Sequence, residues 1–186
     1  MERETMSDEY QYKRVGRELI HKGAIIDYYQ DTIQLPDGRE EKWDFIDHKG
    51  AAAVVPVKED GKILMVRQYR NALERYTLEI PAGGLNGADE PTAVAAAREL
   101  EEETGYRCEE LELLISVRTT VAFCNEKIDV YAAKNLIPGV QHLDDDEYLG
   151  VEEHTMEELE QMILRQEIQD AKTIAALMAY KVKYGA

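Results

Sequence analysis

The order in which strand-like and helix-like segments alternate is the strongest constraint on how this chain folds. Apolar runs of strand length come first, one helix follows, and further strands and two more helices complete the chain. This order predicts an α/β fold in which a mixed sheet carries helices on its faces, an α/β/α layered arrangement. The expected strands are residues 50–57, 62–69, 76–80, 111–117, 127–133 and 149–155, and the expected helices are residues 91–104, 156–165 and 171–184.

A separate unit is expected before these segments. The turn signal Pro36-Asp37-Gly38 separates two β-forming runs, residues 32–35 and 41–46, and predicts a hairpin. We therefore expect a small antiparallel unit here, which makes residues 1–47 an N-terminal β extension and residues 48–186 the main domain. An isolated hairpin buries little apolar surface, so this unit must pack either on the main domain or on a second subunit.

Composition argues against several classes of partner. The 186-residue chain has a net charge of −16 at pH 7, which argues against a broad surface for nucleic acid or for anionic membranes. A phosphorylated small molecule is compatible with this charge, because bound metal ions reverse the local sign. The N-terminal residues do not resemble a secretory signal, and no apolar run approaches the ~18 residues of a membrane span. The two cysteines, Cys108 and Cys124, form no CxxC pair, and together these features predict a cytoplasmic protein.

The helix expected over residues 91–104 carries three carboxylates on one face. Glu99, Glu102 and Glu103 stand at positions i, i+3 and i+4, and like charges placed in this way repel one another. Hard divalent cations compensate such a group, and Mg²⁺ prefers oxygen ligands together with substrate phosphates. A solvated acidic face is the plainer explanation of the same spacing. Arg98 lies four residues before Glu102 and is expected to pair with it.

Another face of this helix is expected to pack inward. Pro91 suits the first helical turn, and Gly105 is a natural stop. The inward face should consist of Ala93, Ala97, Leu100 and Thr104.

The residues around the carboxylates resemble the Nudix box. Gly84 is followed after five residues by Glu90, and after seven more by the run Arg98–Glu103 and then Gly105. Every fixed position of that motif is matched, which is a far stronger signal than a lone glycine motif. Tyr106 is a mild departure, because the family usually has an aliphatic residue there.

The resemblance implies a Nudix α/β/α sandwich and a hydrolase that uses Mg²⁺, with Mn²⁺ as a substitute. It implies that Glu99, Glu102 and Glu103 bind metal, and that Arg98 and Glu102 take part in catalysis. In the family, a backbone carbonyl just before the box also binds metal. That carbonyl belongs to Ala82 or to Gly83, because this chain has one more glycine before the box than its relatives commonly have.

The segment before the box is similar to the Nudix subgroup that hydrolyses ADP-ribose and related nucleoside diphosphate sugars. The likeness rests on Arg67-Gln68-Tyr69-Arg70 and Leu78-Glu79-Ile80-Pro81-Ala82. It implies that Arg70 contacts the substrate diphosphate and that Glu79 lies near the substrate, with a surface arginine and a structural glutamate as the alternatives. It also implies that Trp43 stacks on the adenine, although a lone tryptophan is more often a core residue.

The chain departs from this subgroup after the box. ADP-ribose hydrolases commonly have a Ser-Pro-Gly-like turn there, whereas residues 118–126 contain no proline or glycine. Asn125-Glu126 does resemble the residues that come after that turn, which makes Glu126 a candidate substrate-binding residue. In the subgroup, the general base often comes from a glutamate in the loop before the last strand. Glu147 is the only glutamate in the matching loop, and Asp145 is the alternative.

The resemblance implies an enzyme that hydrolyses ADP-ribose to AMP and ribose 5-phosphate. GDP-mannose or another nucleoside diphosphate sugar is the alternative substrate. A catalytically silent nucleotide-sugar sensor is the alternative from a different class, but every box carboxylate is present, which favours the enzyme. Relatives in the subgroup exchange the N-terminal region across a two-fold axis, so the resemblance also implies a homodimer.

Overall fold

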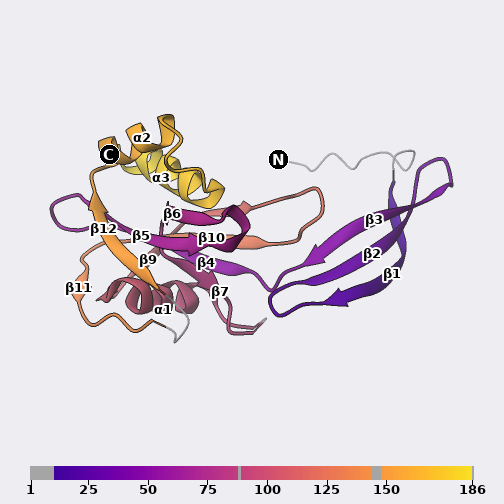
Figure 1. Ribbon diagram of the computed structural model, residues 1–186, viewed down its shortest axis with the longest axis horizontal. Coiled ribbons are helices and arrows are strands. Elements are labelled where there is room, and N and C mark those ends of the chain that lie inside the picture. Colours follow the sequence, from indigo (N-terminus) through magenta and orange to yellow (C-terminus); the bar gives the residue numbers. More distant parts are fainter. Residues whose placement is uncertain (1–10, 88, 144–147, 186) are drawn as a thin grey trace. The chain divides into compact units, whose positions relative to one another are not determined.

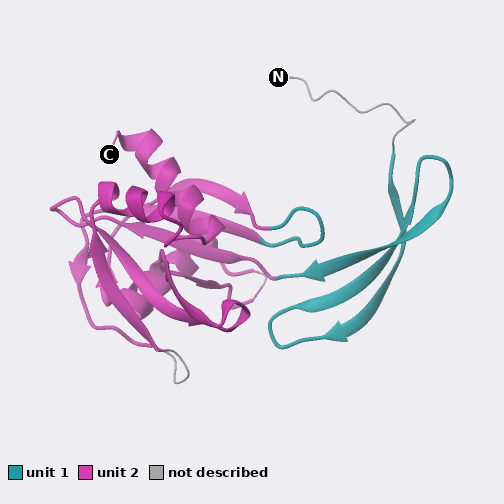
Figure 2. Cartoon of the chain, turned by 45° about the horizontal axis from the view of Figure 1, so that its top comes forward, with its two compact units in different colours: residues 1–48, 120–126 teal, residues 49–119, 127–186 magenta. Residues whose placement is uncertain are grey.

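The computed structural model describes residues 11–87, 89–143 and 148–185, and the chain divides into two compact units (Figure 2). Unit 1 comprises residues 1–48 and 120–126, and unit 2 comprises residues 49–119 and 127–186. Residues 120–126 therefore belong with the N-terminal segment, although they are distant from it in sequence. No helix in the described part of the chain is long and apolar enough to cross a membrane.

Unit 1 contains a three-stranded antiparallel sheet (Figure 1). Its strands are β1 (Lys13–Lys22), β2 (Asp27–Gln34) and β3 (Glu40–Asp47), in that order. The expected hairpin is confirmed: between β2 and β3, Gly38 takes a φ of 87° and its N–H donates to the Leu35 carbonyl at 2.9 Å. Glycine adopts this left-handed conformation without steric cost. β1 adds a strand that the sequence pattern did not delimit.

Unit 1 buries few of its own side chains. Among its described residues, only Asp31 and Ile33 of β2 are buried. Arg17 donates two hydrogen bonds to Asp31, at 2.6 and 2.8 Å, and its guanidinium lies 3.9 Å from the centre of the Phe45 ring. A thin sheet of this kind has little core, and large apolar side chains remain exposed on it. These are Val15, Leu19, Ile20, Ile25, Ile26 and Trp43.

The second segment of unit 1 attaches to the end of β3. The Ile46 N–H donates to the Phe123 carbonyl at 2.7 Å. The Asn125 side chain accepts a hydrogen bond from the His48 N–H at 2.8 Å and donates one to Asp47 at 2.5 Å. These contacts fix residues 120–126 beside the point where the chain leaves the three-stranded sheet.

Unit 2 contains the predicted mixed sheet. Its strands are β4 (Ala51–Pro56), β5 (Ile63–Arg70), β6 (Arg75–Glu79), β7 (Ala82–Gly84), β8 (Tyr106–Arg107), β9 (Leu111–Arg118), β10 (Lys127–Ala133), β11 (Ile137–Pro138) and β12 (Leu149–His154), and its helices are η2 (Asn71–Leu73), α1 (Thr92–Thr104), α2 (Met156–Leu164) and α3 (Ala171–Tyr184). One sheet has the order β7-β4-β10-β9, with β4 and β10 parallel and the other neighbours antiparallel. A second, antiparallel sheet has the order β12-β5-β6, and β8 pairs with β11.

Strand β4 lies between the helical layers, and all of its residues are buried. Its odd-numbered residues join a core cluster with α2 and α3, whereas Ala52 and Val54 join clusters with α1. Because successive side chains of a strand point to opposite faces, one apolar run supports helices on both sides. Figure 1 shows α1 on one side of the strands and α2 with α3 on the other, which confirms the α/β/α arrangement.

Helix α1 is rotated relative to the inward face that the sequence predicted. Ala93 is exposed and Ala97 is only half-buried, so the prediction was wrong at Ala93. It assumed that the carboxylates would stay outside, but the helix packs on β4 and β7 with part of its carboxylate face turned inward. The buried residues of α1 are Ala95, Ala96, Glu99, Leu100, Glu103 and Thr104.

Candidate active site

Two of the box carboxylates are buried beside β7. The exposed fraction is 8% for Glu99 and 3% for Glu103, whereas 38% of the Glu102 side chain is exposed. Glu103 accepts a hydrogen bond from the Ala82 N–H at 2.9 Å. This burial excludes the solvated acidic face that the spacing alone had allowed, because carboxylates are rarely buried without a partner.

Arg98 holds the carboxylate cluster together. Its Nη1 donates to Glu99 at 2.6 Å and to Glu102 at 2.8 Å, which confirms the expected pair with Glu102. Its Nη2 donates to the Gly84 carbonyl at 3.1 Å, and its Nε lies 3.5 Å from Glu90. Although burial opposes the charged guanidinium, the charge of Glu99 and the hydrogen bonds to the carboxylates raise the pKa of Arg98. The cation offsets the repulsion among the carboxylates and connects α1 to the end of β7.

Gly83 allows β7 to approach α1 closely. A Cβ atom at this position would lie 2.0 Å from Glu99 Oε1 and 2.2 Å from its carboxyl carbon. At Gly84, a Cβ atom would meet nothing within 4 Å. The extra glycine before the box therefore has a steric reason, because a side chain at position 83 would overlap the Glu99 carboxylate.

The pairing of β7 with β4 decides where the backbone groups of β7 point. Just before β7, the Pro81 carbonyl accepts a hydrogen bond from the Val54 N–H of β4 at 3.0 Å. Just after β7, the Leu85 N–H donates to the carbonyl of Gly50, the residue before β4, at 3.3 Å. Bonded positions alternate along an antiparallel pair, so Gly83 also directs its N–H and C=O toward β4. Ala82 directs its backbone groups the other way, where its N–H meets Glu103. The Ala82 carbonyl therefore points away from β4.

These groups fit a hard divalent cation. Within the described residues, no three acidic, histidine or cysteine side chains already surround a metal position. The donor chemistry is nevertheless suitable, because the carboxylates share one helix face and β7 lies so close that a Cβ at Gly83 would overlap Glu99. Carboxylate and carbonyl oxygens are the ligands that Mg²⁺ accepts from proteins. The box carboxylates and the β7 backbone are thus a candidate metal centre.

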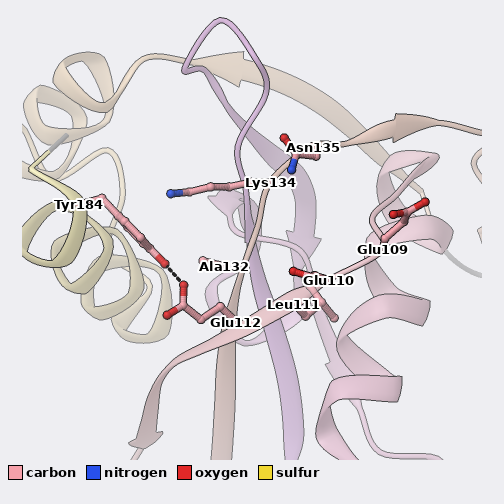
Figure 3. Close-up of a pocket in the computed structure, with 8 residues that line it drawn as sticks. All are labelled: Glu109, Glu110, Leu111, Glu112, Ala132, Lys134, Asn135 and Tyr184. Carbon is pink, nitrogen blue, oxygen red and sulfur yellow. Dashed lines mark hydrogen bonds between the residues drawn. The ribbon is translucent and has the colours of Figure 1, made fainter.

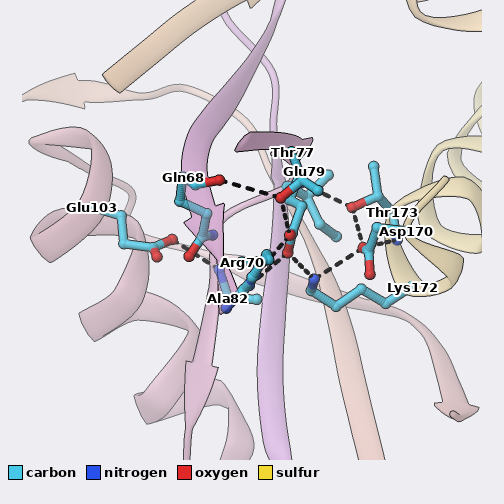
Figure 4. Close-up of polar contacts among 10 residues, drawn as sticks. Gln68, Arg70, Thr77, Glu79, Ala82, Glu103, Asp170, Lys172 and Thr173 are labelled. Carbon is cyan, nitrogen blue, oxygen red and sulfur yellow. Dashed lines mark hydrogen bonds and ion pairs between the residues drawn. The ribbon is translucent and has the colours of Figure 1, made fainter. Parts of the chain in front are cut away.

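A second polar cluster, here called the Arg70 cluster, consists of Arg70 of β5, Thr77 and Glu79 of β6 and Lys172 of α3 (Figure 4). Arg70 donates to Glu79 twice, from Nε at 2.8 Å and from Nη2 at 2.6 Å. Glu79 is only 2% exposed and also accepts from Lys172 of α3 at 2.5 Å and from Thr77 at 2.7 Å. The Arg70 side chain is 41% exposed. The buried Glu79 therefore holds the guanidinium on its inner side, while part of the Arg70 side chain faces solvent.

The two cations determine the ionisation of Glu79. Burial alone would raise the pKa of this carboxyl, but the hydrogen bond from Arg70 and the charge and hydrogen bond of Lys172 outweigh it and lower the pKa to about 2. The hydrogen bond to Glu79 in turn raises the pKa of Arg70, with a smaller contribution from the negative charge of Glu103. Glu79 is therefore an anchor for Arg70 and a poor base, and Arg70 lies within electrostatic reach of the box carboxylates.

The structure brings some predicted site residues together and places others elsewhere. Trp43 lies on β3 of unit 1, where it is 46% exposed and its ring is 5.7 Å from that of Tyr12, so it is not a core residue. Glu126 lies in the second segment of unit 1, 3.5 Å from His48. Glu147 and Asp145 fall outside the described residues. The residues that unit 2 brings together are Arg70, Glu79, Ala82, Arg98, Glu99, Glu102 and Glu103.

Sequence reasoning did not identify the polar residues that support Arg70 and Glu79. These are Thr77 and Lys172, which donate to Glu79, and Thr173, which accepts from the neighbouring Ile80 N–H. A signal for Lys172 was present, because it precedes the buried residues Ala176 and Tyr180 by one and two helical turns and so falls on the apolar stripe of α3. A lysine in that position indicates a buried ion pair.

A groove of about 660 Å³ lies elsewhere in unit 2 (Figure 3). It forms where β9 begins and where β10 and α3 end. There the Tyr184 hydroxyl donates to Glu112, and Lys134 Nζ lies 3.5 Å from the centre of the Tyr184 ring. None of the residues that line this groove belongs to the box or to the Arg70 cluster. The candidate active site is therefore recognised by its chemical groups and not by this cavity.

Substitution of Gly83 tests the close approach of β7. Because a Cβ atom would meet the end of a flexible side chain, Gly83→Ala is expected to displace the Glu99 carboxylate rather than the backbone. Mn²⁺ affinity measured by calorimetry should fall by about 10–100-fold. The free energy of unfolding in urea should fall by about 1 kcal/mol. Gly84→Ala is the matched control, and equal losses of metal affinity in both variants would contradict the steric argument.

Comparison with known proteins agrees with the motif and the geometry. The NUDIX domain model matches residues 47–177. The chain is 41% identical over 170 residues to the methanol dehydrogenase activator of Bacillus methanolicus, covering 90% of this chain and 91% of that protein. It is 39% identical over 173 residues to the ADP-ribose pyrophosphatase of Bacillus subtilis, covering 92% of this chain and 93% of that protein.

A solved structure shares the fold. The crystal structure of an ADP compounds hydrolase matches with a TM-score of 0.83 at 18% identity, covering 94% of this chain and 95% of the other. The domain match extends over most of the sequence, and the box carboxylates that define the motif are assembled at one place in the fold. This chain therefore belongs to the Nudix family.

Proposed function

We propose that this Nudix pyrophosphohydrolase cleaves the diphosphate bond of ADP-ribose or a related nucleoside diphosphate sugar, giving a nucleoside monophosphate and a sugar phosphate. The observation that carries the proposal is the position of Arg70, whose guanidinium is held by the buried Glu79 while 41% of the side chain is exposed, in the same unit as the box carboxylates. A fixed guanidinium suits a diphosphate, and carboxylates suit the metal that such a bond needs for hydrolysis. ADP-ribose pyrophosphatases from Bacillus subtilis and Mycobacterium tuberculosis, 39% and 33% identical to this chain, support ADP-ribose as the substrate.

The metal centre in this proposal is built from α1 and β7. Bound Mg²⁺, or Mn²⁺ in its place, would neutralise the diphosphate and lower the pKa of water. Glu99, Glu102 and Glu103 would supply carboxylate oxygens, and Arg98 would hold the carboxylates of Glu99 and Glu102 in place. The backbone ligand is assigned to the Ala82 carbonyl, because the backbone groups of Gly83 face β4.

Further groups must contact the substrate and the attacking water. We assign Arg70 to the diphosphate, with Glu79 as its anchor. Trp43 is exposed enough to stack on the adenine, and Glu126 is retained as a substrate contact. The general base is assigned to Glu147, with Asp145 as the alternative.

We expect a homodimer in which the strands of unit 1 pack on the partner subunit. The apolar side chains exposed on this sheet need a surface to cover them, and a two-fold axis supplies one. Sedimentation equilibrium at micromolar concentration should therefore give about twice the chain mass of 21.2 kDa. A 21.2 kDa species would contradict this expectation, as would full activity after deletion of residues 1–47.

A substrate panel tests the proposed activity. The purified protein is incubated with Mg²⁺ and each of ADP-ribose, GDP-mannose and other nucleoside diphosphate sugars, and a phosphatase releases phosphate from any monophosphate formed. ADP-ribose should give the highest kcat/KM, with AMP and ribose 5-phosphate as products. A higher kcat/KM for GDP-mannose would identify GDP-mannose as the preferred substrate instead. Absence of hydrolysis with Mg²⁺ and Mn²⁺ across the panel would favour the nucleotide-sugar sensor.

A second candidate function is supported by the methanol dehydrogenase activator of Bacillus methanolicus. That protein is 41% identical to this chain and matches 90% of it, so a role as an activator of a methanol dehydrogenase is compatible with the sequence. Addition of this protein to a methanol dehydrogenase assay, with and without Mg²⁺, tests that role. An unchanged dehydrogenase rate would leave diphosphate hydrolysis as the function.

A further inference from the structure

Lys172 of α3 reaches the Arg70 cluster from the far end of the sequence. Its Nζ donates to Glu79 at 2.5 Å, across 93 residues of chain, and to Asp170 at 2.9 Å. Only 10% of its side chain is exposed, compared with 41% for Arg70. Removing a lysine from water is costly, and the two carboxylates offset that cost. Stabilising the start of α3 does not by itself explain why this lysine is buried against Glu79.

The first turn of α3 also contacts Ile80, the residue after β6. Asp170 caps the helix by accepting from the Thr173 N–H at 3.0 Å, and it accepts from the Thr173 hydroxyl at 2.6 Å. The Thr173 Oγ1 in turn accepts a hydrogen bond from the Ile80 N–H at 3.1 Å. Ile80 lies two residues before Ala82, whose N–H meets Glu103. This helical turn thus contacts Glu79, the partner of Arg70, and also Ile80, which lies two residues before β7 (Figure 4).

Lys172 changes the charge that Arg70 presents to a ligand. Glu79 accepts from both cations, so its single negative charge is shared between Arg70 and Lys172. Without Lys172, Glu79 would be matched by Arg70 alone, and the local charge facing a diphosphate would fall by one. Glu79 would also lose the contact that holds it on the side of α3. Both effects would weaken the attraction of Arg70 for phosphate oxygens.

We infer that Lys172 is a positioning residue for substrate binding, which acts through Glu79 to hold and polarise Arg70 for the substrate diphosphate. This inference rests on the proposed function, because it takes the diphosphate as the ligand of Arg70. Lys172 itself does not touch the substrate. The competing explanation is that Lys172 only stabilises α3, and the two explanations differ in how KM and diphosphate affinity respond.

The test compares Lys172→Met with Lys181→Met. Lys181 lies on the same helix and pairs with Glu160, but its side chain is 43% exposed and it contacts no residue of the Arg70 cluster. Lys172→Met should raise KM for ADP-ribose by about tenfold, the loss expected for one charged hydrogen bond, with kcat changed much less. Calorimetry without metal should show that this variant binds ADP more weakly than the native enzyme does, with AMP affinity nearly unchanged. Lys181→Met should leave all four quantities at their native values.

A double-mutant cycle separates positioning from simple destabilisation. If Lys172 acts through Arg70, then Lys172→Met in an Arg70→Ala background should change KM by less than about twofold. Lys172→Arg retains the charge and should restore most of the lost affinity. If Lys172→Met does not fold, Lys172→Gln replaces it in the cycle, because the amide keeps an N–H donor for Glu79.

Three results would overturn the inference. They are a native KM in folded Lys172→Met, an equal loss of ADP and AMP affinity, and full additivity with Arg70→Ala. Failure of the proposed function has a different signature, because the native enzyme would then hydrolyse no nucleoside diphosphate sugar at all. In that case, a loss of ADP affinity without a loss of AMP affinity in Lys172→Met would still show that Lys172 positions Arg70.

Discussion

Glu103→Gln is expected to lower kcat for ADP-ribose by more than about 100-fold while the protein stays folded. Glu103 is 3% exposed and lies beside β7, so a glutamine of the same size fills its place, and its amide oxygen can still accept from the Ala82 N–H. The substitution removes the negative charge that a metal ligand supplies, which weakens metal binding and the activation of water. The measurements are kcat at saturating Mg²⁺, Mn²⁺ affinity by calorimetry, and thermal unfolding.

Glu101→Gln on the same helix is the matched control. Its side chain is 39% exposed, and it lies 3.6 Å from Arg107, away from the box carboxylates. It should retain native kcat and native Mn²⁺ affinity. Glu102→Gln should resemble Glu103→Gln or be somewhat milder, because Glu102 is the more exposed carboxylate. Near-native turnover by Glu103→Gln at saturating Mg²⁺ would show that the metal assignment is wrong.

Local sequence patterns predicted the long elements of this fold well. Strand β10 and helix α3 were expected at residues 127–133 and 171–184, and the structure has the same bounds. Both are long enough to show their period, and α3 has clear end signals, with Asp170 as its N-cap and Gly185 in the left-handed conformation after its last turn. The Nudix box, including the pair of Arg98 with Glu102, was predicted because its spacing is a local property of one helix.

Features that depend on contacts between distant segments were not predicted. Strands β7, β8 and β11 have two or three residues each, too few to show a period of two. The steric need for Gly83 arises only once β7 is placed beside Glu99. The contact of Lys172 with Glu79 joins residues 93 positions apart. The inward face of α1 was misjudged at Ala93 for the same reason, because Glu99 and Glu103 turn toward a strand and are buried there.

Glu147→Gln is expected to lower kcat by about 10²–10⁴-fold with little change in KM, the usual loss when a general base is removed. Glu147 lies outside the described residues, so its assignment rests on the resemblance to the ADP-ribose subgroup, and the described site adds only that its own carboxylates are committed to other partners. Glu99 and Glu102 are held by Arg98, and Glu79 is held by Arg70 and Lys172. Carboxylates held by cations or committed to metal are poor bases. The prediction takes Glu147 as a carboxylate without such a commitment, which could take a proton from the attacking water.

Asp145→Asn is the paired control, because it removes a neighbouring carboxylate of the same loop. Steady-state kinetics at saturating Mg²⁺ should show a large loss of kcat for Glu147→Gln and a small one for Asp145→Asn, with KM nearly constant in both, since a base contributes little to ground-state binding. The reverse pattern would assign the base to Asp145. Small losses in both variants would place the base outside this loop, with Glu126 as the next carboxylate to replace, or would mean that metal-activated water needs no separate base.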